Sequence, residues 1–228
     1  MELPASSVAL LGGTGRSGPG LALRFAMAGM RVHIGSREAT RGEGAAAQVS
    51  AQLAAVMDGR AGVVSGHGNA EAAGLAEVAF VTVPYEGQRV MLPELAETLA
   101  GRVVVSTAVP MSFNRERGPE AIAVPEGSAA EQVAALLPRS RVVAGFHSLS
   151  SSVLALPERA IDAHVIVTGD DEVAKATAMA LAELLAGVRA VDGGPLRYAR
   201  QSEALTVLLL SINRIYRRHA GVIVTDLP

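Results

Sequence analysis

Short apolar runs alternate with amphipathic, often alanine-rich segments along the first two thirds of the chain. Val78–Val83 is continuously apolar and ends at Pro84, as a strand buried on both faces of a parallel sheet would be. The same pattern predicts strands at 7–12, 31–35, 63–65, 78–83, 102–107 and 141–145, and helices at 16–29, 38–57, 69–75, 86–99 and 128–137. Residues 111–126 carry glycine, proline and charges, so we expect a loop there.

This alternation of strands and helices predicts an α/β fold with a doubly wound, mostly parallel sheet of the Rossmann type. Right-handed crossovers then bring the carboxyl ends of the strands to one edge, where such sheets bind ligands. The segments expected at this edge are Gly13–Ser17, Gly35–Arg37, Val83–Tyr85, Ala108–Pro110 and Phe146–Ser148. Pro84, Val109 and Pro110 therefore join the candidate cofactor-binding residues.

The last third of the chain has a different character. Strands are predicted at 164–168 and 189–192, a helix at 170–186, and a long helix from 196 to about 219. We expect residues 1–150 to form a dinucleotide-binding domain. Residues 151–228 should form a small C-terminal α/β unit that closes over the second-substrate site and contributes to dimerisation.

Composition narrows the classes of function. The chain has 228 residues and a net charge of −2. This nearly balanced charge does not indicate binding to nucleic acid or to an anionic membrane. It has no cysteine, so disulfides and thiolate metal sites are excluded, and no metal site is predicted. No apolar run is long enough to span a bilayer, and no signal peptide is apparent. A cytoplasmic location fits these features.

The clearest motif is the glycine turn after the first predicted strand. Gly13, Gly15 and Gly18 fit G-x-G-x-x-G between a strand and a helix, which is the dinucleotide-binding arrangement. Gly13 should permit the tight turn, Gly15 the close approach of a pyrophosphate, and Gly18 the close packing of helix on sheet. The start of the helix would offer free N–H groups and a positive dipole end to the phosphates.

The end of the second strand indicates which dinucleotide binds. NAD-binding folds usually place a carboxylate there, whereas this chain has Ser36 and Arg37, with Arg41 one helical turn later. A hydroxyl and guanidinium groups would bind a 2′-phosphate, which favours NADP(H). Glu38 is expected to point into the first turn of the following helix.

These residues together resemble the family of NADPH-dependent reductases of the deazaflavin coenzyme F420. The matching pieces are Leu10–Gly15, Gly35–Arg37, Val83–Tyr85, Val109–Pro110, Phe146–Ser148, Gly169–Asp171, Asp192–Leu196 and Glu203–Thr206. They run in order along nearly the whole chain. The resemblance implies a Rossmann domain, a homodimer, and reversible hydride transfer between the nicotinamide and the deazaflavin.

The resemblance also implies roles for individual residues. Thr14, Gly15, Arg16 and Ser17 would hold the pyrophosphate, and Val83 would lie near the nicotinamide. His147 would act as the catalytic residue, bonding the carbonyl edge of the deazaflavin, with Leu149 in the same pocket. Gly194, Pro195 and the end of the last helix would close that pocket. The chain departs from the family pattern at Ser148–Ser151 and Arg217–His219, which are expected near the second substrate.

Two other functions remain open from the sequence. An NADPH-dependent reductase of a small carbonyl or imine would need a proton donor, for which Tyr85, Tyr198 and His147 are the candidates. Reductases of this kind with a catalytic lysine carry it on a long helical C-terminal domain; the single lysine, Lys175, follows an acidic helix start, and the chain has too few residues left for that domain. A redox sensor that binds NADPH without turnover is the non-enzymatic alternative.

Overall fold

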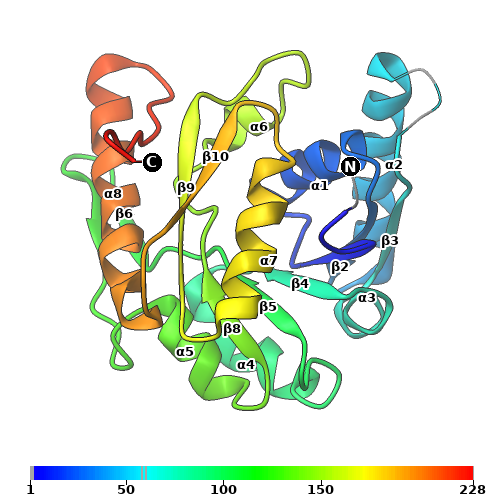
Figure 1. Cartoon of the computed structure of the whole chain (residues 1–228), viewed down its shortest axis with the longest axis horizontal. Helices are drawn as coiled ribbons and strands as arrows, with labels where there is room; N and C mark the ends of the chain where they lie inside the picture. The colour runs from blue at the N-terminus through cyan, green and yellow to red at the C-terminus, as the bar shows by residue number, and fades with distance from the viewer. Residues whose placement is uncertain (1–2, 58, 60, 228) are drawn as a thin grey trace.

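The computed structural model describes residues 3–57, 59 and 61–227. The described residues form an eight-stranded sheet in the order β10-β9-β8-β5-β4-β1-β2-β3 (Figure 1). Six neighbouring strands are parallel: β1 Ser7–Leu11, β2 Arg31–Ser36, β3 Val64–Gly68, β4 Val78–Val81, β5 Val103–Ser106 and β8 Arg141–Ala144. The mostly parallel α/β fold predicted from the sequence is therefore confirmed.

Helices cover both faces of the sheet. The helices of one face are α1 Gly18–Met27, α2 Ala39–Val56, α6 Ser151–Leu154 and α7 Glu172–Glu183. Those of the other face are α3 Asn69–Leu75, α4 Tyr85–Leu95 and α5 Ala129–Leu136. Alternate residues of each strand point to opposite faces, so Leu10 and Phe80 belong to the first apolar core and Ala9 and Val81 to the second.

The direction of the last two strands differs from the expectation of a parallel sheet. β9 Ala163–Gly169 pairs antiparallel with β8, and β10 Val188–Asp192 pairs parallel with β9. The connection from β8 to β9 contains one four-residue helix, α6, and the chain enters β9 at the edge where β8 ends, so β9 runs in the opposite direction. Residues after 150 thus extend the same sheet, and their division into a separate domain stays a prediction.

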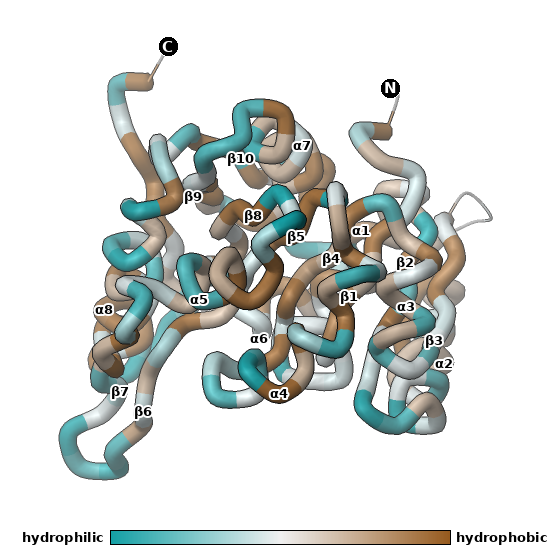
Figure 2. The backbone as a smooth tube through the Cα atoms, turned by 90° about the horizontal axis from the view of Figure 1, so that it is seen from below, coloured by the Kyte–Doolittle hydropathy of each residue, from teal (hydrophilic) through white to brown (hydrophobic). Residues whose placement is uncertain are grey.

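We predicted that the segment 111–126 is a loop, but part of it forms a β-hairpin. It contains a hairpin of β6 Met111–Asn114 and β7 Gly118–Ala121, which lies beside the last helix and projects away from the sheet (Figure 2). The Asn114 side chain accepts bonds from the N–H groups of Glu116 and Arg117 at 2.8 and 3.0 Å. Gly118 has a φ of 95°, so an asparagine and a glycine shape this turn.

Several predicted helices end earlier than expected. α4 stops at Leu95 rather than at residue 99, and Pro93 inside it cannot donate a hydrogen bond to the preceding turn. The last segment begins as a 3₁₀ turn, η1 Leu196–Tyr198, and continues as α8 Ala199–Tyr216. Arg217 ends α8 in the left-handed conformation, with a φ of 52°. Within the described ranges no helix is long and apolar enough to cross a membrane.

Candidate functional site

The strand order brings the predicted site segments to one edge of the sheet. The chain proceeds from β1 to β2 and β3 on one side, and from β4 to β5 and β8 on the other, so a switch point lies between β1 and β4. Ligands of open α/β sheets bind at such a point. The segments that follow these carboxyl ends are Gly13–Ser17 after β1, Ser36–Arg41 after β2, Val83–Pro84 after β4, Val109–Pro110 after β5, and His147–Leu149 after β8.

Three glycines of the turn after β1 have different steric requirements. Gly12, with a φ of 73°, adopts the left-handed conformation of the turn, which we had attributed to Gly13. A Cβ on Gly13 would lie 2.6 Å from the Leu10 carbonyl oxygen, so this residue is a glycine because of packing. A Cβ on Gly18 would lie 2.0 Å from the Gly13 carbonyl oxygen, which the close packing of α1 forbids.

The beginning of α1 is open to an anion. Pro19 occupies the first turn, which contains no acidic residue, and the Ser17 side chain makes no capping bond. Among the described residues, no acceptor pairs with the backbone N–H groups of Thr14, Arg16 or Ser17. A Cβ on Gly15 would touch only the Gly12 carbonyl oxygen, at 3.6 Å, so the exposed side of the turn has room. Free N–H donors and a positive dipole end suit a phosphate.

The end of β2 carries two exposed cations. Ser36 is buried at the end of the strand, whereas Arg37 and Arg41 are exposed on the following turn and on α2. In the part of the chain that the structure describes, neither arginine forms an ion pair. Glu38 is extended and its side chain makes no capping bond to α2. Two guanidinium groups are thus available to a dianion beside Ser36.

Asn69 is a residue of this site that the sequence analysis missed. It lies at the first position of α3, and its side-chain Oδ1 accepts a 3.0 Å bond from the Gly12 N–H. The available signal was an asparagine directly after a strand, which usually indicates capping of the helix it opens. In the structure the side chain instead reaches the glycine turn, 57 residues away in the sequence.

The neighbouring strand ends pack against the same turn. A Cβ on Gly12 would lie 2.7 Å from Cγ2 of Val83, so the half-buried valine side chain covers the turn from the β4 side. Pro84 is exposed and precedes α4. After β5, Val109 is half-buried, and the buried Pro110 lines a cavity of about 350 Å³.

His147 follows a strained turn at the end of β8. Phe146 has a φ of 67°, unusual for a residue other than glycine, and packs its ring edge-on against Phe80 with centroids 5.0 Å apart. The Nδ1 atom of His147 is buried and has no hydrogen-bond partner among the described residues. Burial lowers the pKa of His147 to about 4, against the opposing effect of the Gly145 carbonyl. The imidazole is therefore neutral near pH 7.

The depressed pKa of His147 predicts a pH dependence of stability. The unfolded chain takes up this proton near the ordinary histidine pKa of 6.5, whereas the folded chain does so only near 4. The stability that the neutral His147 contributes is therefore fully present above pH 6.5. It is lost as the pH falls toward 4, because the unfolded chain binds the proton first. We expect His147→Gln to reduce the loss of stability between about pH 7 and 5, measured by urea unfolding. His219→Gln is the control at an exposed histidine, and equal profiles for wild type and His147→Gln would contradict the prediction.

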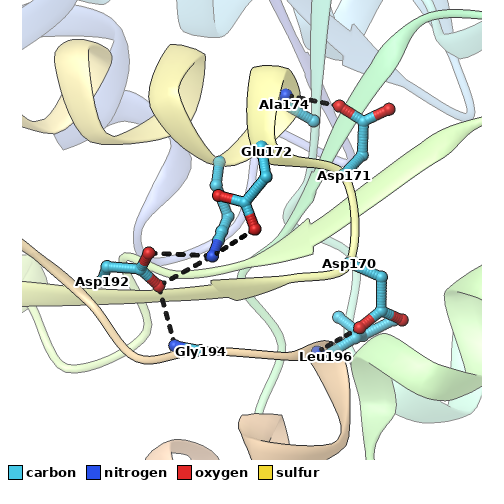
Figure 3. Close-up of polar contacts among 8 residues, drawn as sticks. Asp170, Asp171, Glu172, Ala174, Asp192, Gly194 and Leu196 are labelled. Carbon is cyan, nitrogen blue, oxygen red and sulfur yellow. Dashed lines mark hydrogen bonds and ion pairs between the residues drawn. The ribbon is translucent and has the colours of Figure 1, made fainter.

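The turn of Gly194 and Pro195 lies beside β8, whereas His147 follows the end of that strand. β9 runs away from that edge, and the Gly169 N–H at its end donates to the Gly194 carbonyl. Since Gly169 pairs with Val143, the turn is one residue before the carboxyl end of β8. Two carboxylates hold it there: Asp192 accepts from the Gly194 N–H at 2.8 Å, and Asp170 accepts from the Leu196 N–H at 3.0 Å (Figure 3). Leu149, by contrast, is buried next to His147.

Lys175 belongs to the same group of polar contacts. Its Nζ donates to both carboxylate oxygens of Asp192, at 2.8 and 3.0 Å, and pairs with Glu172 at 3.1 Å (Figure 3). The hydrogen bond to Asp192 is the main reason why the pKa of Lys175 is raised. A permanently charged lysine that joins α7 to the end of β10 is a structural group rather than a proton-transferring one.

A second cavity lies closer to His147. It has a volume of about 150 Å³ and is enclosed by Ser148–Ser150, Val153, Arg159–Ala163 and His219–Gly221. Ser150 Oγ and His219 Nδ1 are 3.3 Å apart across it. The segment after α8 therefore returns to the start of β9, where the His164 N–H donates to the Val222 carbonyl at 2.6 Å.

The larger cavity contains a buried carboxylate. Glu203 of α8 accepts bonds from the N–H groups of Ala129 and Ala130 at 3.0 and 3.1 Å. Burial raises the pKa of Glu203 to about 7, although the two N–H donors oppose the shift. The beginning of α5 is thus closed by the protein's own carboxylate, in contrast to that of α1.

Known proteins match this chain over nearly its whole length. A family model described as "NADP oxidoreductase coenzyme F420-dependent" matches residues 7–110. An F420-dependent NADP reductase of Methanothermobacter marburgensis is 40% identical over 97% of this chain and 99% of its own length. The reductase of the same name from Methanocaldococcus jannaschii is 36% identical over 96% of this chain and 98% of its own length.

A solved structure agrees with these relatives. A chain assigned as an F420-dependent NADP-reductase from an Arthrobacter species superimposes with a TM-score of 0.77 and 25% identity. The match covers 96% of this chain and 99% of that one. With the glycine turn, the strand order and the full-length identity in agreement, the chain belongs to the family of F420-dependent NADP reductases.

Proposed function

We propose that the protein transfers a hydride reversibly between NADP(H) and the deazaflavin coenzyme F420. The observation that carries this proposal is the 40% identity to an archaeal F420-dependent NADP reductase across 97% of the chain. Identity over that length includes both halves of the strand edge, and not only the glycine turn that many dinucleotide-binding proteins share.

The nucleotide half of the site is supported by the N–H groups of Thr14, Arg16 and Ser17, which have no acceptor among the described residues. Thr14, Gly15, Arg16 and Ser17 would bind the pyrophosphate through the open start of α1. Ser36, Arg37 and Arg41 would bind the 2′-phosphate, because a hydroxyl and two exposed guanidinium groups lie at the end of β2. Val83, Pro84, Val109 and Pro110 follow β4 and β5, on the side of the switch point where the nicotinamide would lie.

The second substrate would bind near the end of β8. His147 and Leu149 would contact the deazaflavin, and the cavity bounded by Ser148–Ser150 and His219–Gly221 is next to them. Gly194 and Pro195, in the turn after β10, would close this pocket.

The bound nicotinamide and deazaflavin rings supply the hydride chemistry, so the protein needs to hold and shield them. Val83 and Leu149 would exclude water from either side. His147 is neutral near pH 7. With its one ring proton on Nδ1, which has no partner among the described residues, it would donate to a carbonyl oxygen. Such a donor stabilises negative charge that develops on the reduced ring.

Stopped-flow absorbance of the purified protein with NADPH and oxidised F420 tests the proposal. We expect rapid bleaching of the deazaflavin band at the same rate as NADPH is oxidised. Tight NADPH binding without bleaching would contradict the proposed second substrate and would direct the search to carbonyl and imine acceptors. NADPH binding without turnover of any acceptor would support the redox-sensor alternative.

The proposal includes a homodimer and a cytoplasmic location. Large apolar side chains are exposed on α8 and on the adjacent hairpin, which is typical of a surface that another protein copy covers. They are Met111, Phe113, Leu208, Ile215 and Tyr216. Gel filtration that gives only a monomer at micromolar concentration would contradict the dimer.

A further inference from the structure

We propose that Asn69 is a positioning residue for NADP(H), holding the glycine turn in the conformation that receives the pyrophosphate. The inference rests on the nucleotide half of the proposed function. It assigns to a side chain outside the G-x-G-x-x-G motif the task of orienting that motif.

The contact itself is short and specific. Oδ1 of Asn69 accepts a 3.0 Å hydrogen bond from the N–H of Gly12, and the asparagine is only 9% exposed. Gly12 is the residue with a φ of 73°, so the bond is made at the point where the chain leaves β1 and reverses direction. A partly buried N–H that loses its acceptor is destabilising, so this contact constrains the turn.

The surroundings of Asn69 are adapted to this contact. A Cβ on Gly35, near the end of β2, would lie 2.7 Å from Asn69 Oδ1, so only a glycine leaves space for the side chain to pass. On the other side of the turn, Gly13 donates to the Gly35 carbonyl at 2.9 Å. Gly12, Gly13 and Gly35 are thus joined around one amide group, between the expected pyrophosphate and ribose positions.

The helix that carries Asn69 is fixed independently of the nucleotide. In its first turn, Glu71 pairs with His67 Nδ1 at 3.0 Å, and His67 Nε2 is 2.8 Å from Ser65 Oγ. At its other end, Arg102 donates to the carbonyl groups of Ala73 and Ala76. α3 is therefore a rigid support, and Asn69 can organise the turn before any ligand arrives, which lowers the ordering cost of binding.

Binding of two probes by purified full-length protein tests this role. NADPH contacts the glycine turn through its pyrophosphate, whereas adenosine 2′-monophosphate has no 5′-phosphate and would contact the Ser36–Arg41 segment alone. Asn69→Ala should raise the Kd of NADPH roughly ten-fold, which corresponds to the loss of one hydrogen bond. The Kd of adenosine 2′-monophosphate should change less than about two-fold, since its contacts are left in place.

Two further variants make the test specific. Asn69→Asp keeps an oxygen in the same position, so it should restore part of the NADPH affinity that Asn69→Ala loses. Asn114→Ala removes comparable side-chain bonds to backbone N–H groups at the hairpin turn, away from the strand edge, and should leave both Kd values unchanged.

Each outcome decides between the inference and its alternatives. A positioning role is supported if Asn69→Ala weakens the binding of NADPH but not of adenosine 2′-monophosphate, and if Asn69→Asp restores NADPH binding. Equal weakening of both probes, or unchanged NADPH binding, overturns it while leaving the proposed function intact. If wild-type protein binds neither NADPH nor adenosine 2′-monophosphate, the proposed function fails and the inference fails with it.

Discussion

Replacing Gly18 with alanine is expected to abolish measurable NADPH binding and to destabilise the fold. The added Cβ would lie 2.0 Å from the carbonyl oxygen of Gly13 and 2.5 Å from its carbonyl carbon. Both are backbone atoms, so α1 or the glycine turn must move, and overpacking of this kind costs roughly 2–3 kcal/mol. A displaced turn no longer directs the N–H groups of Thr14–Ser17 at one phosphate position, so the Kd should rise more than ~100-fold.

Two other glycines provide matched comparisons for Gly18→Ala. A Cβ on Gly15 touches only one atom, at 3.6 Å, so Gly15→Ala should leave the free energy of unfolding within about 0.5 kcal/mol of wild type. Gly15→Ala should still weaken NADPH binding, because the added methyl group would occupy the exposed side of the turn. Gly44 lies on the exposed side of α2 with nothing near its Cβ position, and Gly44→Ala should stabilise the protein by up to about 1 kcal/mol.

Urea unfolding and isothermal titration calorimetry measure these effects separately. Gly18→Ala should lower both stability and NADPH affinity, Gly15→Ala affinity alone, and Gly44→Ala neither. Wild-type NADPH binding by Gly18→Ala would show that the turn does not receive the pyrophosphate.

Replacing Arg37 with alanine is expected to remove the preference for NADPH over NADH. Arg37 is exposed at the end of β2, beside the buried Ser36, and a charge-assisted bond from its guanidinium to a 2′-phosphate would contribute roughly 1.5–3 kcal/mol. The Kd of NADPH should therefore rise ~10- to 150-fold, because 1.4 kcal/mol corresponds to a factor of ten. NADH lacks the 2′-phosphate, so its Kd should change less than about two-fold.

A second arginine controls for the loss of positive charge in general. Arg117 is exposed on the hairpin and pairs with Glu120 at 3.1 Å, so Arg117→Ala changes the net charge equally without touching β2. It should leave the affinities for both nucleotides unchanged. Calorimetric titrations of both variants with NADPH and NADH measure these affinities. An equal loss of affinity for both nucleotides in Arg37→Ala would rule out a 2′-phosphate contact.

Local patterns in the sequence were sufficient to predict the parallel core of the fold. Apolar runs such as Val78–Val83 identify buried strands, and a glycine turn between a strand and a helix indicates a nucleotide site. Short-range sterics and hydrogen bonding decide these features, so they can be read from neighbouring residues. Family membership was also predicted, because the matching motifs extend in order along nearly the whole chain.

Details of the candidate site were less accessible. The sequence shows that Gly12 and Gly13 form a turn, yet only the packing of Val83 and Leu10 around them shows which glycine has a positive φ and which avoids a clash. The strain at Phe146 is likewise held by aromatic packing against Phe25 and Phe80, residues distant in the chain.

By itself, the sequence determined the alternation of strands and helices, the nucleotide turn and the cationic end of β2, since each depends on a few consecutive residues. The tertiary structure alone decided the reversal of β9 and β10, the place of the Gly194–Pro195 turn, and the contact of Asn69 with Gly12. These features depend on pairing between segments tens of residues apart, and local periodicity carries no information about which distant partner a side chain or strand will meet.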